Sequence, residues 1–554
     1  MVSGGLRHVK FWSTSGPTLR AKRGLYGKLE KVHSTTITRA VNHFYVPNHA
    51  GSSQGGGEPK GSFCLITSSL SGHLYRWEGR KCSPEPPLPA CYPEPIHAMA
   101  AIGYSKETSR LVIGDNEGCV KVYGASLDKI VEYNLADLVD SVKPRDLGVA
   151  SIRSVDIFGY SDARHPVDQH GCKILVGTLS SEVYEIKGPG LETSSSKIEN
   201  LHNGALVQGH FKNGQTKKDE VWGLAIDPNS KNYFATAGDD NTVRIWSMGN
   251  RKMIACFALQ SDGTKESART VAWSKAFNKE GSSFLAVGLG GNVEGQKKYA
   301  GDGGVILLMV PPITSHGSDI HLTLLHRVSA TDSGVMIRGV ADIKFFVEFE
   351  KSVRVAVASQ SGVIFVGEVD LEKQHLKFSK VGIVENDKRR ASGHAGFANH
   401  IDFSVCGNYL QSNWASSDVG LFDLRFHKVG LKKFFDFKKE KVTGKTLCDK
   451  TYESWTCPLG WPVRGIWPAG ADGTEINAVH RSSSEQYVAA ADDFGKVKVF
   501  NYPCTVEGSP FVSGSGHSSR VTNVRFSGDD GNLITCGGND RTVIQWKVDV
   551  TFDE

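Results

Sequence analysis

Two glycine motifs in the sequence have residue types at a spacing that could support chemistry. Gly51 to Gly55 reads GSSQG, the pattern of a serine nucleophile elbow, and Gly290 to Gly295 matches the first half of a phosphate-binding loop. A nucleophile elbow needs a strand before the serine and a helix after it, whereas this segment has the glycine, serine and proline composition of a loop insert. A phosphate loop needs a Lys-Ser/Thr pair, which Gln-Lys-Lys replaces here. Neither motif predicts an enzyme site.

Histidines and paired aspartates are the other residue types that could be catalytic. None of the 19 histidines stands at metal-ligand spacing from another histidine or from a cysteine. The pairs Asp239-Asp240 and Asp492-Asp493 lie in turn sequences, and adjacent residues of a strand point to opposite faces. The sequence therefore predicts no catalytic residue, no bound metal and no cofactor.

One charged segment bears on binding. It reads KKFFDFKKEKVTGK, and its phenylalanines could anchor it while its lysines stay in water. Such a segment could attract an acidic partner in a salt-sensitive way, or it could be an ordinary solvated loop. Both interpretations stay open. The candidate binding residues, the lysine cluster, are Lys432, Lys433, Lys438, Lys439 and Lys441. A second basic run is Arg20–Arg23.

Composition and charge exclude several classes of protein. The 554 residues carry 64 basic and 59 acidic side chains, a net charge of +5, which is too little for a dedicated nucleic-acid binder. No apolar run is long enough to span a membrane, and the first residues lack the features of a secretory signal. The 11 cysteines have no regular spacing and read as reduced thiols. These features predict a soluble cytoplasmic protein.

A short strand pattern recurs ten times along the chain. It consists of a turn residue followed by alternating apolar positions, as in GHLYRW, NTVRIW and RTVIQW. A second β run that ends in small residues precedes nearly every copy, and a third run lies further upstream. Repeated sets of antiparallel strands joined by hairpins are the layout of propeller blades, so the predicted fold is all-β. The ten copies end at Trp12, Trp77, Tyr123, Ile186, Trp246, Leu308, Val366, Phe422, Phe500 and Trp546.

Nine complete units are too many for one ring, since propellers usually have four to eight blades. The linker-like composition between Lys187 and Gln208 suggests a division there. We expect residues 1–190 to be the incomplete C-terminal part of a first propeller and residues 207–554 to be a nearly complete second one. The strand that ends at Trp12 then lacks partners before it, so a partner chain or a longer chain would supply the missing blades.

Two units carry the polar residues typical of the WD repeat. In such blades a histidine, a strand hydroxyl, a turn aspartate and a tryptophan form a buried hydrogen-bonded chain, which avoids about 1–3 kcal/mol for each polar group that would otherwise be unsatisfied. The middle unit has all four, whereas in the last unit we assign the hydroxyl position to Cys536, which would leave that chain incomplete. The predicted network residues are His210, Thr236, Asp240 and Trp246, and then His517, Asp540 and Trp546.

The C-terminal part of the sequence resembles the echinoderm microtubule-associated protein-like family. The resemblance is strongest over Ser454–Val548 and includes the stretch WPAGADGTEINAV. It implies tandem atypical WD-repeat propellers that bind tubulin and microtubules and have no enzymatic activity. It also implies that this chain begins where members of the family are already several blades into their first propeller.

The resemblance leaves two classes of function to compare. The first is a non-catalytic microtubule-associated protein of the cytoplasm and cytoskeleton, with other cytoskeletal or axonemal proteins as partners and a role in cilia or flagella open. The alternative is a general WD-repeat scaffold or adaptor that assembles a complex unrelated to microtubules. Co-sedimentation with microtubules distinguishes them.

Overall fold

A computed structural model gives the fold of the chain. It describes separate segments that together make up most of the residues. Nearly all regular structure in these stretches is antiparallel strand, and the helix among them is the 3-10 helix η5 (Trp461–Ile466). The described residues are 2–5, 8–15, 18–25, 37–47, 61–69, 74–83, 96, 98–102, 110–124, 129–135, 151–158, 172–179, 182–188, 209–210, 220–261, 264–265, 267–290, 303–313, 320–329, 339–360, 362–383, 398–415, 419–424, 450–468, 470 and 475–549.

Contacts divide the chain into two compact units, Met1–Gln208 and Gly209–Glu554. Each sheet of the first unit is an antiparallel meander of strands that follow one another in the chain. The first sheet contains β1 (Val2–Gly5), β2 (His8–Ser15) and β3 (Thr18–Arg23). The second contains β4 (Ile37–Pro47), β5 (Gly61–Ser69), β6 (Leu74–Glu78) and β7 (Lys81–Cys82). The third contains β8 (Ala98–Ile102), β9 (Arg110–Gly114), β10 (Cys119–Tyr123) and β11 (Lys129–Asn134), and the fourth β12 (Ile152–Phe158), β13 (Cys172–Thr178) and β14 (Val183–Gly188).

Among its described residues, the second unit contains six antiparallel meander sheets of three or four strands and one two-stranded hairpin. The first has β15 (Val221–Ile226), β16 (Tyr233–Gly238), β17 (Thr242–Ser247) and β18 (Lys252–Ala258), and is followed by the small hairpin β19 (Gln260–Ser261) and β20 (Thr264–Lys265). The second has β21 (Ala268–Trp273), β22 (Ser283–Leu289), β23 (Gly304–Val310) and β24 (Thr323–Ser329). The third has β25 (Val340–Glu348), β26 (Ser352–Ser359), β27 (Val363–Asp370) and β28 (His375–Ile383). The fourth has β29 (Ala398–Phe403), β30 (Tyr409–Trp414) and β31 (Val419–Asp423). The fifth has β32 (Ile476–Arg481), β33 (Tyr487–Asp492), β34 (Lys496–Asn501) and β35 (Phe511–Ser515), and the sixth β36 (Val521–Phe526), β37 (Asn532–Gly537) and β38 (Val543–Lys547).

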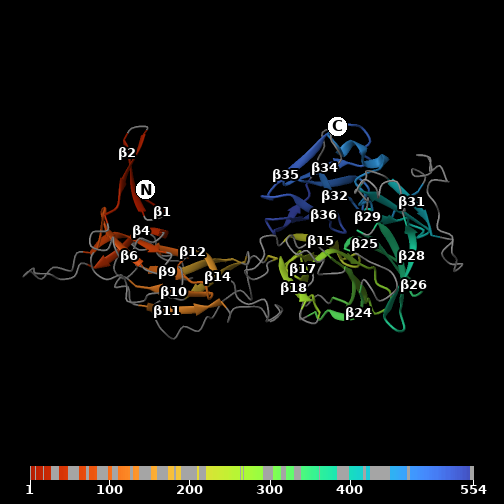
Figure 1. Cartoon of the computed structure of the whole chain (residues 1–554), viewed down its shortest axis with the longest axis horizontal. Helices are drawn as coiled ribbons and strands as arrows, with labels where there is room; N and C mark the ends of the chain where they lie inside the picture. The colour runs from red at the N-terminus through yellow and green to blue at the C-terminus, as the bar shows by residue number, and fades with distance from the viewer. Residues whose placement is uncertain are drawn as a thin grey trace, which may run out of the picture. The chain divides into compact units, whose positions relative to one another are not determined.

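The sheets of the second unit form a closed ring. The yellow-green first sheet lies beside the blue last one, with β15 against β36 and β37 (Figure 1). Successive sheets contact one another mainly through their first strands, which therefore lie nearest the axis of the ring. Between the fourth and fifth sheets, the segment Lys450–Trp467 completes the ring. The carboxylate of Asp402 in the fourth sheet accepts from the backbone N–H of Thr456 at 2.8 Å, and the carbonyl of Trp455 accepts from the backbone N–H of Arg481 in the fifth sheet at 3.1 Å.

The recurring strand pattern corresponds to one strand of each sheet. Nine of the ten copies lie in the third strand of a sheet, and this confirms the predicted all-β repeat architecture. The copy that ends at Trp12 lies instead in β2, the second strand of its sheet. The expectation that this strand lacks partners before it was wrong, because β1 pairs with it from upstream and β3 from downstream.

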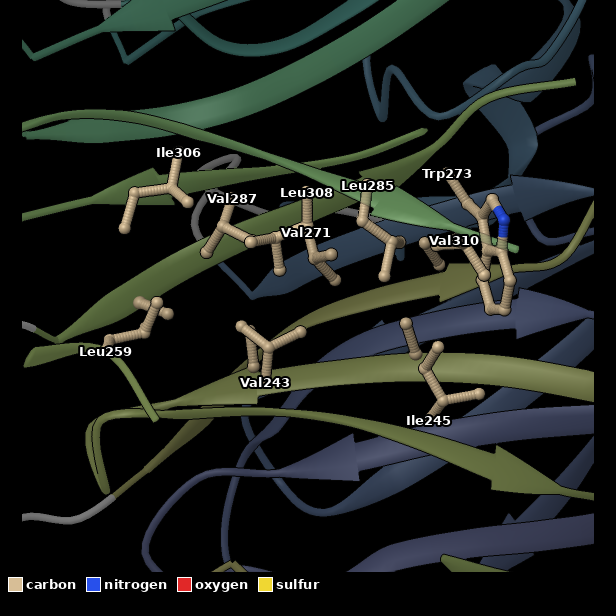
Figure 2. Close-up of a cluster of buried hydrophobic side chains, with 14 of the residues drawn as sticks. Val243, Ile245, Leu259, Val271, Trp273, Leu285, Val287, Ile306, Leu308 and Val310 are labelled. Carbon is tan, nitrogen blue, oxygen red and sulfur yellow. The ribbon is translucent and has the colours of Figure 1, made fainter. Parts of the chain in front are cut away.

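Apolar side chains fill the space between neighbouring sheets. Figure 2 shows Val243 and Ile245 of the first sheet of the ring facing Val271, Leu285 and other side chains of the second. Because alternate residues of a strand point to opposite faces, each sheet of the ring contributes to two such layers, one on each side. Burial of this kind contributes about 25 cal/mol for each Å² of apolar surface removed from water. Packing between sheets thus holds the first strands in place around the axis.

Candidate interaction site in the second unit

The first sheet of the ring brings together the four network residues that its sequence predicts. His210 Nδ1 lies 3.0 Å from Asp240 Oδ2, and His210 Nε2 lies 2.6 Å from the hydroxyl of Thr236. The indole N–H of Trp246 donates to the same hydroxyl at 2.7 Å. Arg244, which the sequence interpretation missed, joins them by donating to Asp240 Oδ2 at 2.8 Å. All five side chains are buried.

Electrostatics fix the charge states in this network. Burial lowers the pKa of His210, so its imidazole is neutral near pH 7. Burial alone would raise the pKa of Asp240, but the hydrogen bond from His210 and the positive charge of Arg244 outweigh it and hold that pKa well below its usual range. Asp240 is therefore an anion paired with Arg244, and each polar group of the chain from Trp246 to Asp240 has a partner. This arrangement stabilises the sheet and leaves no group exposed for catalysis.

The last sheet of the ring repeats the histidine, threonine, aspartate and tryptophan of this network, with Ile544 at the position of Arg244. His517 Nε2 and Trp546 Nε1 lie 2.7 and 2.8 Å from the hydroxyl of Thr535, while His517 Nδ1 lies 3.0 Å from Asp540 Oδ2. The assignment of Cys536 to the hydroxyl position, and with it the incomplete network, was wrong. The hairpin between β37 and β38 is one residue longer than that between β16 and β17, so the hydroxyl stands 11 rather than 10 residues before the tryptophan.

Other sheets contain single tryptophan–hydroxyl pairs, of which Trp77 of β6 lies in a third strand like Trp246, whereas Trp273 of β21 lies in a first strand and Trp414 of β30 in a second. The indole N–H of Trp77 donates to Thr67 at 2.9 Å, that of Trp273 to Ser283 at 3.0 Å, and that of Trp414 to Ser412 at 2.8 Å. A sequence signal for these pairs exists. It is a tryptophan with a serine or threonine on the neighbouring strand, or two residues before it in the same strand. In each pair the hydroxyl satisfies a buried indole N–H.

A cavity of about 320 Å³ lies at the axis of the second unit. Each of the six sheets contributes to its wall from its first strand, for example through Trp222 of β15, Asp342 of β25 and His400 of β29. The sequence analysis identified none of these residues, because they come from strands far apart in the chain. The remaining wall is formed by Arg269, Thr270, Val340, Ala341, Gln360, Asn399, Asn477, Arg520, Thr522, Asn523 and Arg525. We name this cavity the axial pocket.

Arginines dominate the charge of the axial pocket. Two of them lie over the indole of Trp222, with the guanidinium carbon of Arg269 4.4 Å and that of Arg520 4.8 Å from a ring centroid. Arg520 also pairs with Glu220 at 2.5 Å, which links the last sheet to the first. The third arginine, Arg525, donates to the carbonyl of its neighbour Val524 at 2.7 Å.

Outside the ring, the basic residues of β3 are exposed. Arg20, Lys22 and Arg23 belong to the basic run identified in the sequence, and every residue of the strand Thr18–Arg23 is exposed to solvent. The lysine cluster lies outside the described residues, as do the Gly51–Gly55 motif and most of the glycine-rich stretch after Gly290.

No metal centre is evident where the structure describes the chain. Within those stretches no group of three or more His, Cys, Asp and Glu side chains could hold an ion. The same stretches contain no helix that is both long and apolar enough to cross a bilayer.

The ring of meander sheets and the histidine-to-tryptophan networks define the second unit as a β-propeller of the WD-repeat class. The family model of the echinoderm microtubule-associated protein second beta-propeller matches residues 221–548. The chain belongs to the echinoderm microtubule-associated protein family.

Comparisons with individual proteins extend the similarity to nearly the whole chain. Echinoderm microtubule-associated protein-like 2 of Mus musculus is 27% identical over 99% of this chain, which spans 66% of that relative. Echinoderm microtubule-associated protein-like 3 of Homo sapiens is 26% identical over 99% of this chain, which spans 50% of it. Among solved structures, the computationally designed Ika8 protein aligns with 82% of this chain and 96% of its own at 14% identity, with a TM-score of 0.27.

Proposed function

We propose that this protein is a non-catalytic WD-repeat protein that binds tubulin and associates with microtubules. The observation that carries the proposal is the match of a microtubule-associated family model to the second propeller, residues 221–548. Relatives named as microtubule-associated proteins align along 99% of the chain and support it. The chain spans half to two thirds of the length of these relatives. The proposal makes no use of the parts of the relatives that lie outside the aligned region.

Charge supports an electrostatic contribution to this binding. Microtubule surfaces are strongly acidic, whereas this chain has a net charge of +5 and an exposed basic strand in β3. Basic side chains on a surface attract an acidic partner over a distance set by the ionic strength, about 8 Å at physiological salt. We assign the lysine cluster of residues 432–441 to the same attraction. Binding should therefore weaken as salt is raised.

The polar groups of the propeller favour binding over catalysis. His210 and His517 are each bonded to an aspartate on one ring nitrogen and to a threonine hydroxyl on the other. A threonine that also accepts from a tryptophan indole is held in the sheet and cannot reach a substrate. The proposal therefore includes no reaction and no cofactor.

The proposed organisation follows from the two units. Residues 1–190 would be the incomplete C-terminal part of a first propeller, and residues 207–554 the second propeller. The proposed location is the cytoplasm and the cytoskeleton, and a ciliary or flagellar axoneme is the specialised setting that we propose to examine by localisation.

Co-sedimentation with taxol-stabilised microtubules tests this function. The full chain should pellet with microtubules at moderate salt, and pelleting should weaken when salt is raised or when the acidic tails of tubulin are removed. A WD-repeat adaptor unrelated to microtubules would stay in the supernatant under all these conditions, and that result would reject the proposal.

A further inference from the structure

The axial pocket is built like a binding site. Its wall comes from the first strands of all six sheets, so closure of the ring fixes the positions of its side chains before any ligand arrives. Its volume of about 320 Å³ is at the lower end of the range for sites that bind small groups. The pocket is therefore suited to one side chain or a short stretch of an extended chain.

The positive charges around the pocket are not equally neutralised. Arg520 pairs with Glu220 at 2.5 Å, and Arg269 lies 3.6 Å from Asp239. Arg525 is different, because among the described residues no carboxylate oxygen lies within 4 Å of its guanidinium. Burial lowers the pKa of Arg525, because a half-buried guanidinium loses part of its hydration.

The acids near Arg525 are already engaged elsewhere. Asp342 accepts from Lys344 at 2.8 Å and from the backbone N–H of Ile401 at 3.0 Å. Asp402 accepts from the backbone N–H and the hydroxyl of Thr456 at 2.8 and 2.9 Å. These two carboxylates lower the cost of burying the guanidinium, but neither forms an ion pair with it. One positive charge at the pocket wall is thus unmatched.

Two neutral donors line the same pocket as this charge. His400 and Asn399, neighbours at the start of β29, both line the pocket, and neither side chain has a hydrogen-bond partner in the described part of the chain. Burial lowers the pKa of His400 to about 4, so its imidazole is neutral at pH 7 and offers one N–H donor. An uncharged donor pair and one guanidinium in the same pocket fit an acceptor with a single negative charge.

We propose that the axial pocket of the second propeller binds a glutamate or aspartate side chain of an extended acidic peptide. The guanidinium of Arg525 pairs with the carboxylate, and the side-chain N–H groups of Asn399 and His400 donate to its oxygens. A phosphate dianion fits less well, because the other two arginines are each held by a protein carboxylate. This inference goes beyond the proposed function, since it concerns a peptide in solution and requires no microtubule.

The test measures binding of a fluorescein-labelled hexaglutamate peptide to the full chain by fluorescence anisotropy at physiological salt. Wild type should bind this peptide and not the hexaglutamine peptide. Arg525→Met should weaken binding about tenfold or more, the effect of losing a charge-assisted hydrogen bond, and Arg525→Lys should restore part of it. Arg354→Met is the matched control. It removes one charge from a half-buried arginine that bonds Gly407 and stacks on Phe346 away from the pocket, and it should leave the affinity unchanged.

A second variant covers the case in which Arg525→Met does not fold. Asn399→Phe fills the pocket without removing a charge and should also abolish binding, with the melting temperature of each variant as the measure of folding. Equal affinity for wild type and Asn399→Phe would overturn the proposal, as would competition by inorganic phosphate at a lower concentration than by unlabelled hexaglutamate. Absence of hexaglutamate binding with microtubule pelleting intact would reject the pocket assignment and leave the proposed function standing.

Discussion

The hydroxyl of Thr236 is the group whose removal tests the network most cleanly. Thr236 is fully buried, and its oxygen both accepts from Trp246 at 2.7 Å and lies 2.6 Å from His210 Nε2. With His210 Nδ1 donating to Asp240, the threonine O–H donates to Nε2. Thr236→Val keeps the shape of the side chain but leaves one donor and one acceptor unsatisfied. At about 1–3 kcal/mol for each, the variant should lose about 2–6 kcal/mol of stability.

Hydrogen exchange of the full chain measures this loss where it occurs. The chain has two units and need not unfold in one step, so amides of β16 and β17 give a clearer result than a global transition. Thr323→Val, at an exposed position in β24, is the matched control and should change protection by less than about 0.5 kcal/mol. Equal protection of β16 in Thr236→Val and Thr323→Val would refute the assignment of the network as a stabilising element.

Further predictions concern other parts of the chain. Replacing the lysine cluster by alanine should reduce microtubule pelleting without a change in melting temperature. Unchanged pelleting would favour the interpretation that the cluster is an ordinary solvated loop. Trp246→Ala should cost about 3–5 kcal/mol in thermal unfolding and Trp546→Ala clearly less, because Trp246 is buried whereas Trp546 is half-buried; equal losses would contradict this difference. Gly495→Ala should lower the melting temperature, since Gly495 has φ +76° and a Cβ would lie 2.7 Å from the carbonyl oxygen of His517; an unchanged melting temperature would show that the turn adapts. Stability of the second unit should fall as pH drops below about 6.5, because histidines such as His400, whose pKa desolvation lowers to about 4, stay neutral in the folded state while the unfolded chain takes up protons. Urea denaturation at pH 7.5 and pH 5.5 measures this, and equal stability at the two pH values would contradict it.

The sequence predicted the repeat architecture because its signals are local. Alternating apolar residues after a tight turn specify a half-buried strand wherever they occur, and nine of the ten copies proved to be third strands of a sheet. The copy at Trp12 deviated because its sheet begins only with the short β1, whose glycines give little strand signal. The family resemblance, quoted from residues 454–548, falls within the matched range 221–548.

The network hydroxyl of the last sheet was assigned to Cys536 instead of Thr535 because the hairpins of the two sheets differ in length by one residue. Trp246 stands opposite Phe234 and Trp546 opposite Leu533, and in both sheets the threonine lies two residues after that partner. Counting back from the tryptophan gives the same answer only when the hairpin turns have equal length. The residue Cys536 that this counting selects is adjacent to Thr535, so it points to the other face of the strand.

The axial pocket was beyond reach of the sequence analysis for a different reason. Arg269, His400 and Arg525 lie on three separate first strands and meet only because the ring closes. Nothing in the local pattern of any of these strands distinguishes a residue that faces the axis from one that faces a neighbouring sheet. Closure depends on contacts between β15 and β36, whose sequence separation is nearly the whole second unit.

The most direct measurement of the central claim is a cryo-electron microscopy map of microtubules decorated with the full chain. The account predicts ring-shaped density for the second propeller in contact with tubulin, lost at high salt. A bare lattice at protein concentrations that saturate pelleting, or density that touches only another bound protein, would contradict it.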